Sequence, residues 1–539
     1  MNFMKKLITI IILTTCIYTV NAQNWSDDLG MIDSLHIGGD VAMIEDLFND
    51  GDSVLYIGGS VKYVNTEIVN QILKWDGYNY YLMQDGINHW AVLNTIARYK
   101  NLILVGGDSQ LITTIPNTWR LASWNGTNWQ SVSSEWINGE IKDFAVSNDT
   151  LYIAGRLNKI GNDTTYKVAA FHNGSWIHIS KTSATFGNMS SALEIFNNEL
   201  YAAHYSNGIR KFLGGIAWEI HEEQPNNYIW ELKTDSINSL LYICGGFSMY
   251  GDMPSHAVVI WDGFNYQSTG TYCSNAVWEQ AAAIYRGDLF IGGGSYYEND
   301  LFRAYITRWN GESWDSIGGA FMGNIKAMEV FRDTLYIGGN FRYWGGDSPI
   351  PDKRSKGLVK LYIPDNGCHY LKPRINTYAD TFYLNGGEAV VNLYNNNPYV
   401  DSWEWNFGDS QTGSERNPVH TYTQVGEYNV QVTVTDGECV KTANKTIYIE
   451  LGNEVPQFEK IDMQVHPNPS SNDFRVKVTL PNYQNAEIKI AGINGHLKDI
   501  IPVNGETTII PTKGWSAGVY VCNLFINGNL VKVEKLVFE

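Results

Sequence analysis

A few short patterns in this chain have the residue types of catalytic sites. Gly514-Trp515-Ser516-Ala517-Gly518 has the spacing of a nucleophile elbow, which needs a strand before the serine, a helix after it, and His and Asp partners. The residues that follow predict a strand, so we interpret this pattern as a turn. His221-Glu222-Glu223-Gln224 lacks the second histidine of H-E-x-x-H, which argues against a zinc protease. Asp50 and Asp52 could form an acid/base pair, but we interpret them as turn residues before a strand.

The chain also lacks the usual signatures of bound cofactors and metals. Its 11 histidines are scattered without metal-ligand spacing, and neither a phosphate-binding loop nor a dinucleotide fingerprint occurs. We therefore predict no cofactor, no metal site and no catalytic residue. A repeated fold can still assemble a site from one residue per repeat, so an enzyme stays open as an alternative.

A sequence repeat must position any such site. An apolar segment ending in Gly-Gly, or a close equivalent, returns roughly every 40 to 50 residues through the first two-thirds of the chain, and Trp-Asn/Asp-Gly steps suited to hairpin turns lie between the copies. The seven copies begin at Leu55, Leu104, Leu151, Leu200, Ile243, Phe290 and Leu335. This period, with four strand signals in each repeat, is typical of a propeller blade. We predict an all-β protein that begins with a seven-bladed β-propeller over 24–365.

The ends of this propeller predict how its ring closes. The last repeat has strand signals near 325–331, 334–340 and 357–363 but lacks a fourth, and the segment Trp25 to Ile37 matches the missing strand. The N-terminal strand should therefore pair with the seventh blade, because closure removes sheet edges that would otherwise aggregate. The pattern resembles kelch-type propellers, from which we infer architecture and no activity.

Residues 368–450 form a different unit. Trp405-Asn406-Phe407-Gly408-Asp409 is followed by Pro418-Val419-His420-Thr421-Tyr422 and then by an alternating strand from Tyr428 to Val434. This order resembles the PKD domain, an immunoglobulin-like β-sandwich that usually serves as a spacer or a weak binding module. Residues 451–460 are a polar linker.

The C-terminal residues 461–539 predict a second small β-sandwich. Pro467-Asn468-Pro469 opens it, and Gly518-Val519-Tyr520 and a basic last strand close it. These motifs resemble the C-terminal sorting domain of Bacteroidetes type IX secretion substrates, although His466 stands where that family usually has tyrosine. The resemblance implies the type IX secretion machinery as a partner, and removal of the domain during export.

The N-terminus predicts the first export step. Lys5 and Lys6 precede an apolar stretch too short to span a bilayer, and the spacing indicates cleavage between Ala22 and Gln23, which makes residues 1–22 a signal peptide. No other apolar run suggests a membrane span. The formal charge of −18 disfavours nucleic acid and anionic lipid as partners. The protein should be secreted or held at the outer cell surface.

The cysteines left after both processing steps are even in number, which is compatible with two disulfides in an oxidising compartment. Given the PKD resemblance, we predict a bridge between Cys368, which opens that domain, and Cys439, which follows the Asp436-Gly437 turn. A second bridge, Cys244–Cys273, competes with a buried free thiol at Cys244.

The candidate ligand-binding residues are aromatics outside the repeat. Each precedes the Gly-Gly or Ala-Gly step of its own copy, at the start of a blade's first strand, where kelch-like propellers line their central channel. They are Trp90, Trp136, Trp230, Trp278 and Phe321. We predict that they ring one mouth of the propeller and present flat apolar faces to a sugar ring or an apolar side chain. The alternative is that they pack between blades as additional core.

Together these patterns predict a secreted or cell-surface, non-enzymatic binding or adhesion protein. The propeller would be its recognition head for a glycan or protein ligand, with the PKD domain as a spacer. Two alternatives stay open: a glycan-active enzyme with its site in the propeller mouth, and a structural component of the surface or matrix. An acidic pair near the mouth would favour the enzyme.

Overall fold

The computed structural model is built from β-strands, with one short 3-10 turn at Cys368–Tyr370 among the residues that it describes. The described residues are 24–539 without 33–34, 38–39, 85, 89, 181–188, 205–207, 222, 256, 264, 271–278, 294–295, 299–300, 346–352, 365–367, 378, 385, 399, 452–462, 479–485, 493–496, 504–506 and 527–528. The predicted signal cleavage at Ala22 and Gln23, and most of the linker 451–460, lie outside this range. No helix among the described residues is long and apolar enough to cross a membrane.

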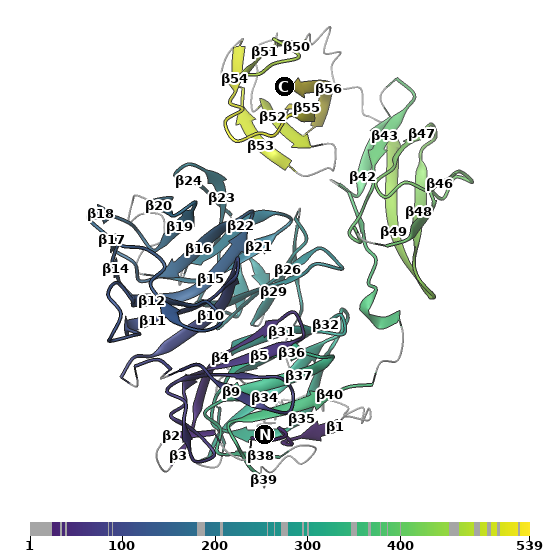
Figure 1. Cartoon of the computed structure of the whole chain (residues 1–539). Coiled ribbons are helices and arrows are strands. Elements are labelled where there is room, and N and C mark those ends of the chain that lie inside the picture. Colours follow the sequence, from purple (N-terminus) through teal and green to yellow (C-terminus); the bar gives the residue numbers. More distant parts are fainter. Residues whose placement is uncertain are drawn as a thin grey trace, which may run out of the picture.

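The first part of the chain is a β-propeller whose blades are antiparallel four-stranded sheets (Figure 1). The first blade orders β4 (Met43–Asp50), β5 (Val54–Ser60), β8 (Ile72–Trp75) and β9 (Tyr80–Leu82) from the axis outward. The next are β10 (Leu93–Tyr99), β11 (Leu102–Gln110), β12 (Trp119–Trp124), β13 (Trp129–Gln130); β15 (Ile141–Ser147), β16 (Thr150–Gly155), β19 (Val168–His172), β20 (Ser175–Ile177); and β21 (Ser190–Phe196), β22 (Glu199–His204), β23 (Ile209–Gly214), β24 (Ala217–Ile220). Then follow β25 (Ile229–Asp235), β26 (Leu240–Gly245), β29 (Val258–Trp261), β30 (Tyr266–Ser268); β31 (Glu279–Tyr285), β32 (Asp288–Gly293), β34 (Leu301–Trp309), β35 (Trp314–Met322); and β36 (Ile325–Phe331), β37 (Thr334–Gly339), β40 (Leu358–Tyr362), β1 (Asn24–Ser26).

The N-terminal strand closes the ring as predicted. In the register of β1 on β40, Trp25 lies opposite Leu361. The first strand of the last blade, β36, in turn packs against β4 of the first. Trp25 packs its ring against Phe321 and Trp344, at centroid distances of 5.9 and 6.0 Å. We call β1 the N-terminal strap. Backbone pairing with β40 and an aromatic contact of Trp25 with blade six hold it in place.

The glycines of the repeat let neighbouring blades approach closely. A Cβ on Gly58 would lie 2.7 Å from a side-chain carbon of Ile96 in the next blade, and one on Gly338 would lie 2.6 Å from a side-chain carbon of Ile44. The tryptophans of the repeat fill the adjoining space. Trp75 is fully buried, with its ring edge-on to Tyr336 at 5.3 Å. The sequence repeat thus arises because the packing between neighbouring blades requires the same residue types in each blade.

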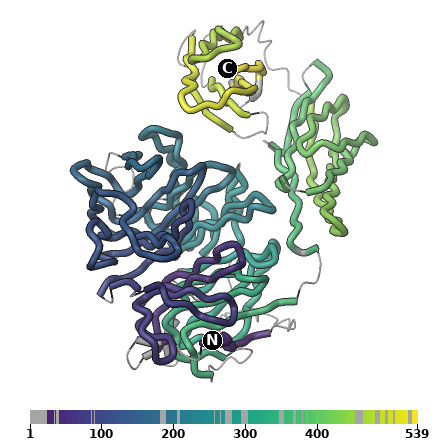
Figure 2. The backbone as a smooth tube through the Cα atoms, in the orientation of Figure 1, coloured from purple at the N-terminus to yellow at the C-terminus, as the bar shows by residue number. Residues whose placement is uncertain are grey.

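The PKD domain is a two-sheet sandwich that lies beside the propeller in Figures 1 and 2. One sheet orders β42 (Thr381–Leu384), β49 (Cys439–Leu451), β48 (Gly426–Asp436), β45 (Ser402–Asn406) and β46 (Thr412–Gly413), and the other pairs β43 (Ala389–Asn392) with β47 (Val419–Tyr422). The disulfide between Cys368 and Cys439 is present, with Cα atoms 5.0 Å apart. Cys244 is buried on β26, and Cys273 lies outside the described residues, so the bridge between them stays a prediction.

The C-terminal domain packs a sheet of β50 (Met463–His466), β51 (Phe474–Val478) and β54 (Thr507–Ile510) against one of β53 (Leu497–Pro502), β52 (Ala486–Gly492), β55 (Gly518–Ile526) and β56 (Asn529–Phe538). Its sorting motifs meet in space. The Asn468 side chain, between Pro467 and Pro469, donates to the Lys535 carbonyl and accepts from the Val537 N–H at 2.9 Å. Ser516 lies in the turn before β55 and its carbonyl accepts from the Tyr520 hydroxyl, so Gly514–Gly518 precedes a strand and is no nucleophile elbow.

Removing the ring of Trp25 should weaken propeller closure. We expect Trp25→Ala to lower the free energy of unfolding by about 2 kcal/mol, less than for a fully buried tryptophan because Trp25 is only partly buried. Urea denaturation of the mature chain measures this. Trp90→Ala is the matched control, since Trp90 is 80% exposed. Equal stability of the Trp25→Ala variant and the wild type would contradict a stabilising role of Trp25 in ring closure.

Candidate functional site

The propeller has two faces that differ in their connections. Because successive strands of a blade are antiparallel, the loops between second and third strands and the loops between blades lie on one face, which we term the loop face. The turns between first and second strands and between third and fourth strands lie on the opposite face, the turn face. Trp90 and Trp136 precede the first strands β10 and β15, so these two predicted aromatics belong to the loop face.

Two of the predicted aromatics are exposed there. Trp90 lies in the loop before β10 and Trp136 in the loop before β15, and their exposed fractions are 80% and 43%. A third tryptophan, Trp119, begins β12 between them and is 44% exposed. We call Trp90, Trp119 and Trp136 the tryptophan cluster. Sequence reasoning missed Trp119 because it begins a third strand and does not precede a first strand, although it is also outside the repeat pattern.

Hydrogen bonds connect the three segments of this cluster. Asn88 accepts from the Trp90 N–H at 3.2 Å and donates from its side chain to the Gln110 carbonyl at 3.2 Å. Gln110 is the register partner of Trp119 on β11 and β12. The neighbouring Arg120 packs over the Trp119 ring at 5.7 Å and donates to the Ile137 carbonyl at 2.9 Å. The backbones that carry the three indoles are therefore tied together across blades two and three.

The other predicted aromatics do not complete a ring around the mouth. Phe321 is only 1% exposed and lies on β35, the outermost strand of blade six, so its prediction as a mouth residue is wrong. The reason is that β35 extends through Met322, which places Phe321 beneath the N-terminal strap, in contact with Trp25 and with Phe341 at 4.9 Å. Trp230 lies on β25, is partly buried and packs on Tyr228 at 5.7 Å. Trp278 lies outside the described residues.

The innermost strands carry a set of charged residues that no linear motif revealed. Asp46, Asp143 and Glu231 each follow a β-bulge in the first strand of blades one, three and five. Bulges re-aim side chains, and these carboxylates act on one another across the ring: the charges of Asp143 and Glu329 both raise the pKa of Asp46. The remaining members are Glu194, Glu329 and Lys233. Six titratable side chains from five blades thus form one axial cluster.

Two of these carboxylates join neighbouring blades. Asp46 accepts from the Ile96 N–H of the next blade at 2.6 Å and from the Leu47 N–H at 2.8 Å. Asp143 accepts from the Leu193 N–H of its next blade at 2.7 Å, and from the N–H of Phe144. These bonds occupy both oxygens of each carboxyl group. Asp46 and Asp143 therefore link each blade to the next by hydrogen bonds.

Burial raises the pKa values of several carboxyl groups of the axial cluster towards neutral pH. Desolvation is the main cause that raises the pKa of Asp46 to about 8, of Glu194 to about 7 and of Asp143 to about 6. It also raises the pKa of Glu231 well above its usual value, helped by the charge of Asp143. Burial lowers the pKa of Lys233, but the surrounding carboxylates outweigh it and hold the ammonium charged. Among the described residues, Lys233 is thus a cation within a group of axial carboxyl groups whose titrations influence one another.

The comparisons with known families place two of the domains. Residues 373–451 match the family described as PKD domain, and residues 464–539 match the secretion system C-terminal sorting domain. The chain carries a PKD domain and a secretion sorting domain. A type IX sorting domain marks a protein for export, so this one is secreted or displayed at the outer surface.

More distant likenesses cover parts of the chain. A microbial collagenase of Vibrio alginolyticus is 22% identical over 308 residues, which are 52% of this chain and 34% of the collagenase. The kelch repeat protein M-T8 of Myxoma virus is 23% identical over 188 residues, 33% of this chain and 32% of that protein. The chain thus spans about a third of each relative's length. The WD40 propeller of Doa1 aligns at 10% identity and a TM-score of 0.38 over 62% of this chain and 97% of that one.

The axial cluster predicts how stability depends on pH. The folded-state pKa values of Asp46, Glu194 and Glu231 lie above the usual values. At pH values between the usual and the folded-state pKa, the folded protein therefore binds more protons than the unfolded chain. The stability that these three groups contribute should therefore be fully present at acidic pH and should be lost as the pH rises from about 5 to about 8. Thermal melts across this range measure the slope.

Glu231→Gln should flatten this slope, because it removes one titrating buried carboxyl group without changing the side-chain shape. Glu67→Gln, at an exposed position of β7 (Glu67–Ile68), is the control. A melting temperature that rises with pH over this range, or an unchanged slope in Glu231→Gln, would contradict the account.

Proposed function

We propose that this exported protein is a non-enzymatic binding protein that recognises carbohydrate through the tryptophan cluster on the loop face of its propeller. The observation that carries the proposal is the joint exposure of Trp90, Trp119 and Trp136 on segments that hydrogen bonds tie together. Single exposed apolar residues are ordinary on protein surfaces. A group of large aromatic side chains on neighbouring loops is typical of a binding surface.

The chemistry of the cluster favours sugar rings. An indole offers a flat apolar face with a polar edge, which suits the C–H face of a pyranose and its hydroxyl groups. Polar side chains stand beside the indoles: Arg120 lies over Trp119, and Glu135 precedes Trp136. Loops supported by a rigid scaffold are also where recognition residues concentrate. A neutral glycan, stacked on the indoles and hydrogen-bonded at its edges, is the ligand class that fits this surface.

One observation favours a second candidate, a glycan-active enzyme that acts in the channel. Glycoside hydrolysis uses one protonated and one ionised carboxyl group, and the axial cluster holds several carboxyl groups whose pKa values lie near neutrality. Asp46 and Asp143 are less suited to this role because their oxygens bind backbone N–H groups. Glu194 and Glu231, beside Lys233, are the residues that an enzyme of this kind would use.

Mutation of the cluster separates these candidates. We expect the triple variant Trp90→Ala, Trp119→Ala, Trp136→Ala to lose about tenfold or more in affinity for the glycans that the wild type retains on a glycan array, equivalent to about 1.4 kcal/mol. Its melting temperature should stay close to that of the wild type, because the three side chains are exposed. Tyr78→Ala, which removes a 61% exposed aromatic from a turn between third and fourth strands, is the matched control.

A reducing-sugar assay on the same glycans tests the second candidate. We expect no release by the wild type. Release that Glu231→Gln abolishes, together with unchanged binding by the triple tryptophan variant, would replace the binding proposal with the enzyme. Loss of stability in the triple variant without any effect on binding would show that the indoles serve packing.

A further inference from the structure

The PKD domain is docked against the turn face of blades five and six through a buried asparagine network. Asn238, in the turn between β25 and β26, is fully buried. Its side chain accepts from the Lys372 N–H at 3.0 Å and donates to the Tyr370 carbonyl at 3.0 Å. Both partners belong to the segment that enters the PKD domain, and the adjacent disulfide at Cys368 anchors this segment to β49.

The PKD domain contributes the other half of the network. Asn396 donates to the Asn238 carbonyl at 2.8 Å, and Asn397 donates to the Asn238 side chain at 3.1 Å and to the Ile237 carbonyl at 3.2 Å. Asn396 and Asn397 are both buried. Because removing one partner would leave buried amide groups without hydrogen bonds, the network fixes the docked arrangement. The PKD domain is therefore more than the spacer that the sequence predicted.

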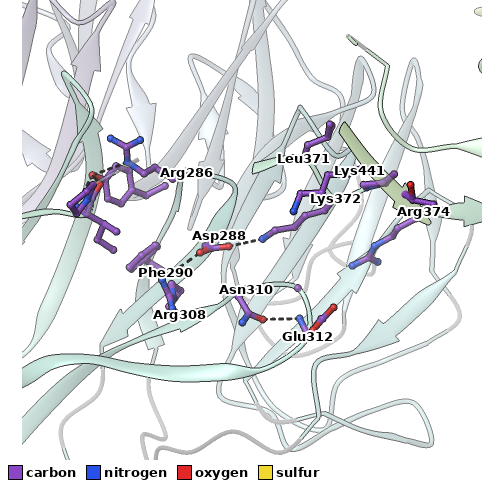
Figure 3. A pocket seen from close by; sticks show the side chains of 16 residues that line it. Arg286, Asp288, Phe290, Arg308, Asn310, Glu312, Leu371, Lys372, Arg374 and Lys441 are labelled. Carbon is purple, nitrogen blue, oxygen red and sulfur yellow. Dashed lines mark hydrogen bonds and ion pairs between the residues drawn. The ribbon is translucent and has the colours of Figure 1, made fainter. Parts of the chain in front are cut away.

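Docking creates a pocket of about 630 Å³ between the two domains (Figure 3). Blade six supplies one wall through Arg286, Asp288 and Arg308. The segment that leads from the propeller into the PKD domain, which we call the connecting segment, supplies Lys372 and Arg374. Lys441, on β49, closes the pocket from the PKD side. Neither domain alone would form it.

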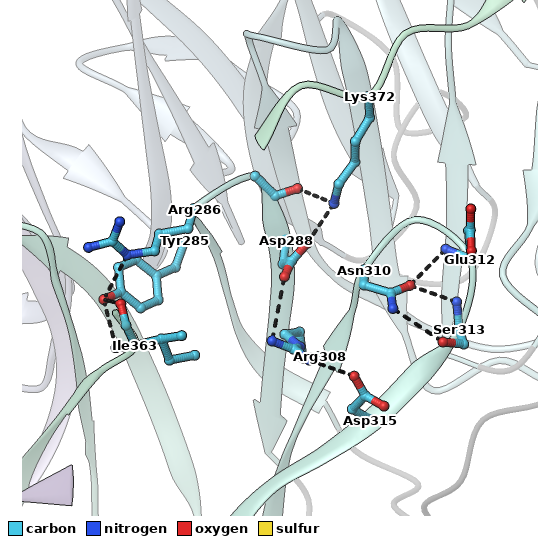
Figure 4. Close-up of polar contacts among 11 residues, drawn as sticks. Tyr285, Arg286, Asp288, Arg308, Asn310, Glu312, Ser313, Asp315, Ile363 and Lys372 are labelled. Carbon is cyan, nitrogen blue, oxygen red and sulfur yellow. Dashed lines mark hydrogen bonds and ion pairs between the residues drawn. The ribbon is translucent and has the colours of Figure 1, made fainter. Parts of the chain in front are cut away.

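The pocket is basic in a chain whose formal charge is −18. Its lining holds five cationic side chains, the three arginines and two lysines just named, and two carboxylates, Asp288 and Glu312. The contacts of Figure 4 neutralise part of this charge: Asp288 binds Lys372 at 2.6 Å and Arg308 at 3.8 Å. Asp315 also binds Arg308, at 2.6 Å, and Asp333 binds Arg286.

Two cationic side chains of the lining have no carboxylate partner among the described residues. Arg374 bonds the neutral side chain of Gln267, and neither Arg374 nor Lys441 forms an ion pair in the described part of the chain. Glu312 also lines the pocket, in a turn where Asn310 accepts from the Glu312 backbone N–H at 2.9 Å, and its carboxylate forms no ion pair with either of these described cations. These two cations come from the connecting segment and from β49, and both line the pocket shown in Figure 3.

We propose that this composite pocket is a second binding site, for an oxyanion such as a carboxylate or sulfate, with Arg374 and Lys441 as its main cationic ligands. The ion pairs of Asp288 with Lys372 and Arg308 order other side chains of the same lining. The volume suits a small anion or one to two acidic sugar units. The site lies on the turn face, so it is separate from the tryptophan cluster and does not depend on the function proposed for it.

Calorimetric titration of the full mature chain tests the site with two probes, sodium sulfate and a short glucuronate oligosaccharide. We expect binding that weakens as ionic strength rises. Arg374→Gln with Lys441→Gln should lower the affinity about tenfold or more. Lys445→Gln is the matched control, because Lys445 lies on the same strand but pairs with Asp380 at 2.7 Å. The triple tryptophan variant should bind both probes as the wild type does.

A third variant tests the composite nature of the pocket. Asn238→Ala should loosen the contact between the PKD domain and the propeller. It should thereby lower the affinity for the anion, although Asn238 itself does not line the pocket. Binding of both probes supports a simple oxyanion site, and binding of the oligosaccharide alone supports an acidic glycan. Absence of binding by either probe at about 10 mM, or equal affinity of the wild type and the Arg374→Gln, Lys441→Gln variant, would overturn the proposal.

Discussion

Closure of the ring by the first strand of the mature chain is the contact on which the rest of the structure depends. β1 pairs with β40 across more than 330 residues of sequence, from Trp25 to Leu361. Forming so distant a contact costs chain entropy, and the aromatic packing of Trp25 on Phe321 and Trp344 offsets part of that cost. Once the ring is closed, the first strands converge on the axis, the loops gather on one face, and the turns on the other face can receive the PKD domain.

The same closure explains the unusual electrostatics of the axis. Carboxylates after bulges in alternate blades are brought together only when the ring is complete, and Lys233 is the cation among them in the described residues. Asp46 and Asp143 reach across to backbone N–H groups of the next blade, so two of the buried carboxyl groups stabilise blade-to-blade contacts. Burial raises the pKa of Asp46 and of the other axial carboxyl groups, which keeps the axis from becoming strongly negative.

Sequence periodicity predicted the architecture well because repeated packing needs repeated residues. Gly58 and Trp75 recur in type because each blade must approach its neighbour closely and fill the same space. The PKD and sorting motifs were likewise readable as ordered motifs. The sites were less predictable. Phe321 was misplaced because a strand ran a few residues longer than expected, and the axial carboxylates and the Asn238 network involve residues whose partners are distant in sequence.

The propeller has a loop face, which we propose recognises carbohydrate, and a turn face that holds the PKD domain. Hydrogen–deuterium exchange of the mature chain, with and without an oligosaccharide retained on the glycan array, tests this division directly. We predict that bound oligosaccharide protects peptides covering 83–92, 110–119 and 131–140, the loops that carry the tryptophan cluster. Protection confined to the inner strands at 43–50, 141–147 and 229–235 would contradict it and would place the ligand in the channel.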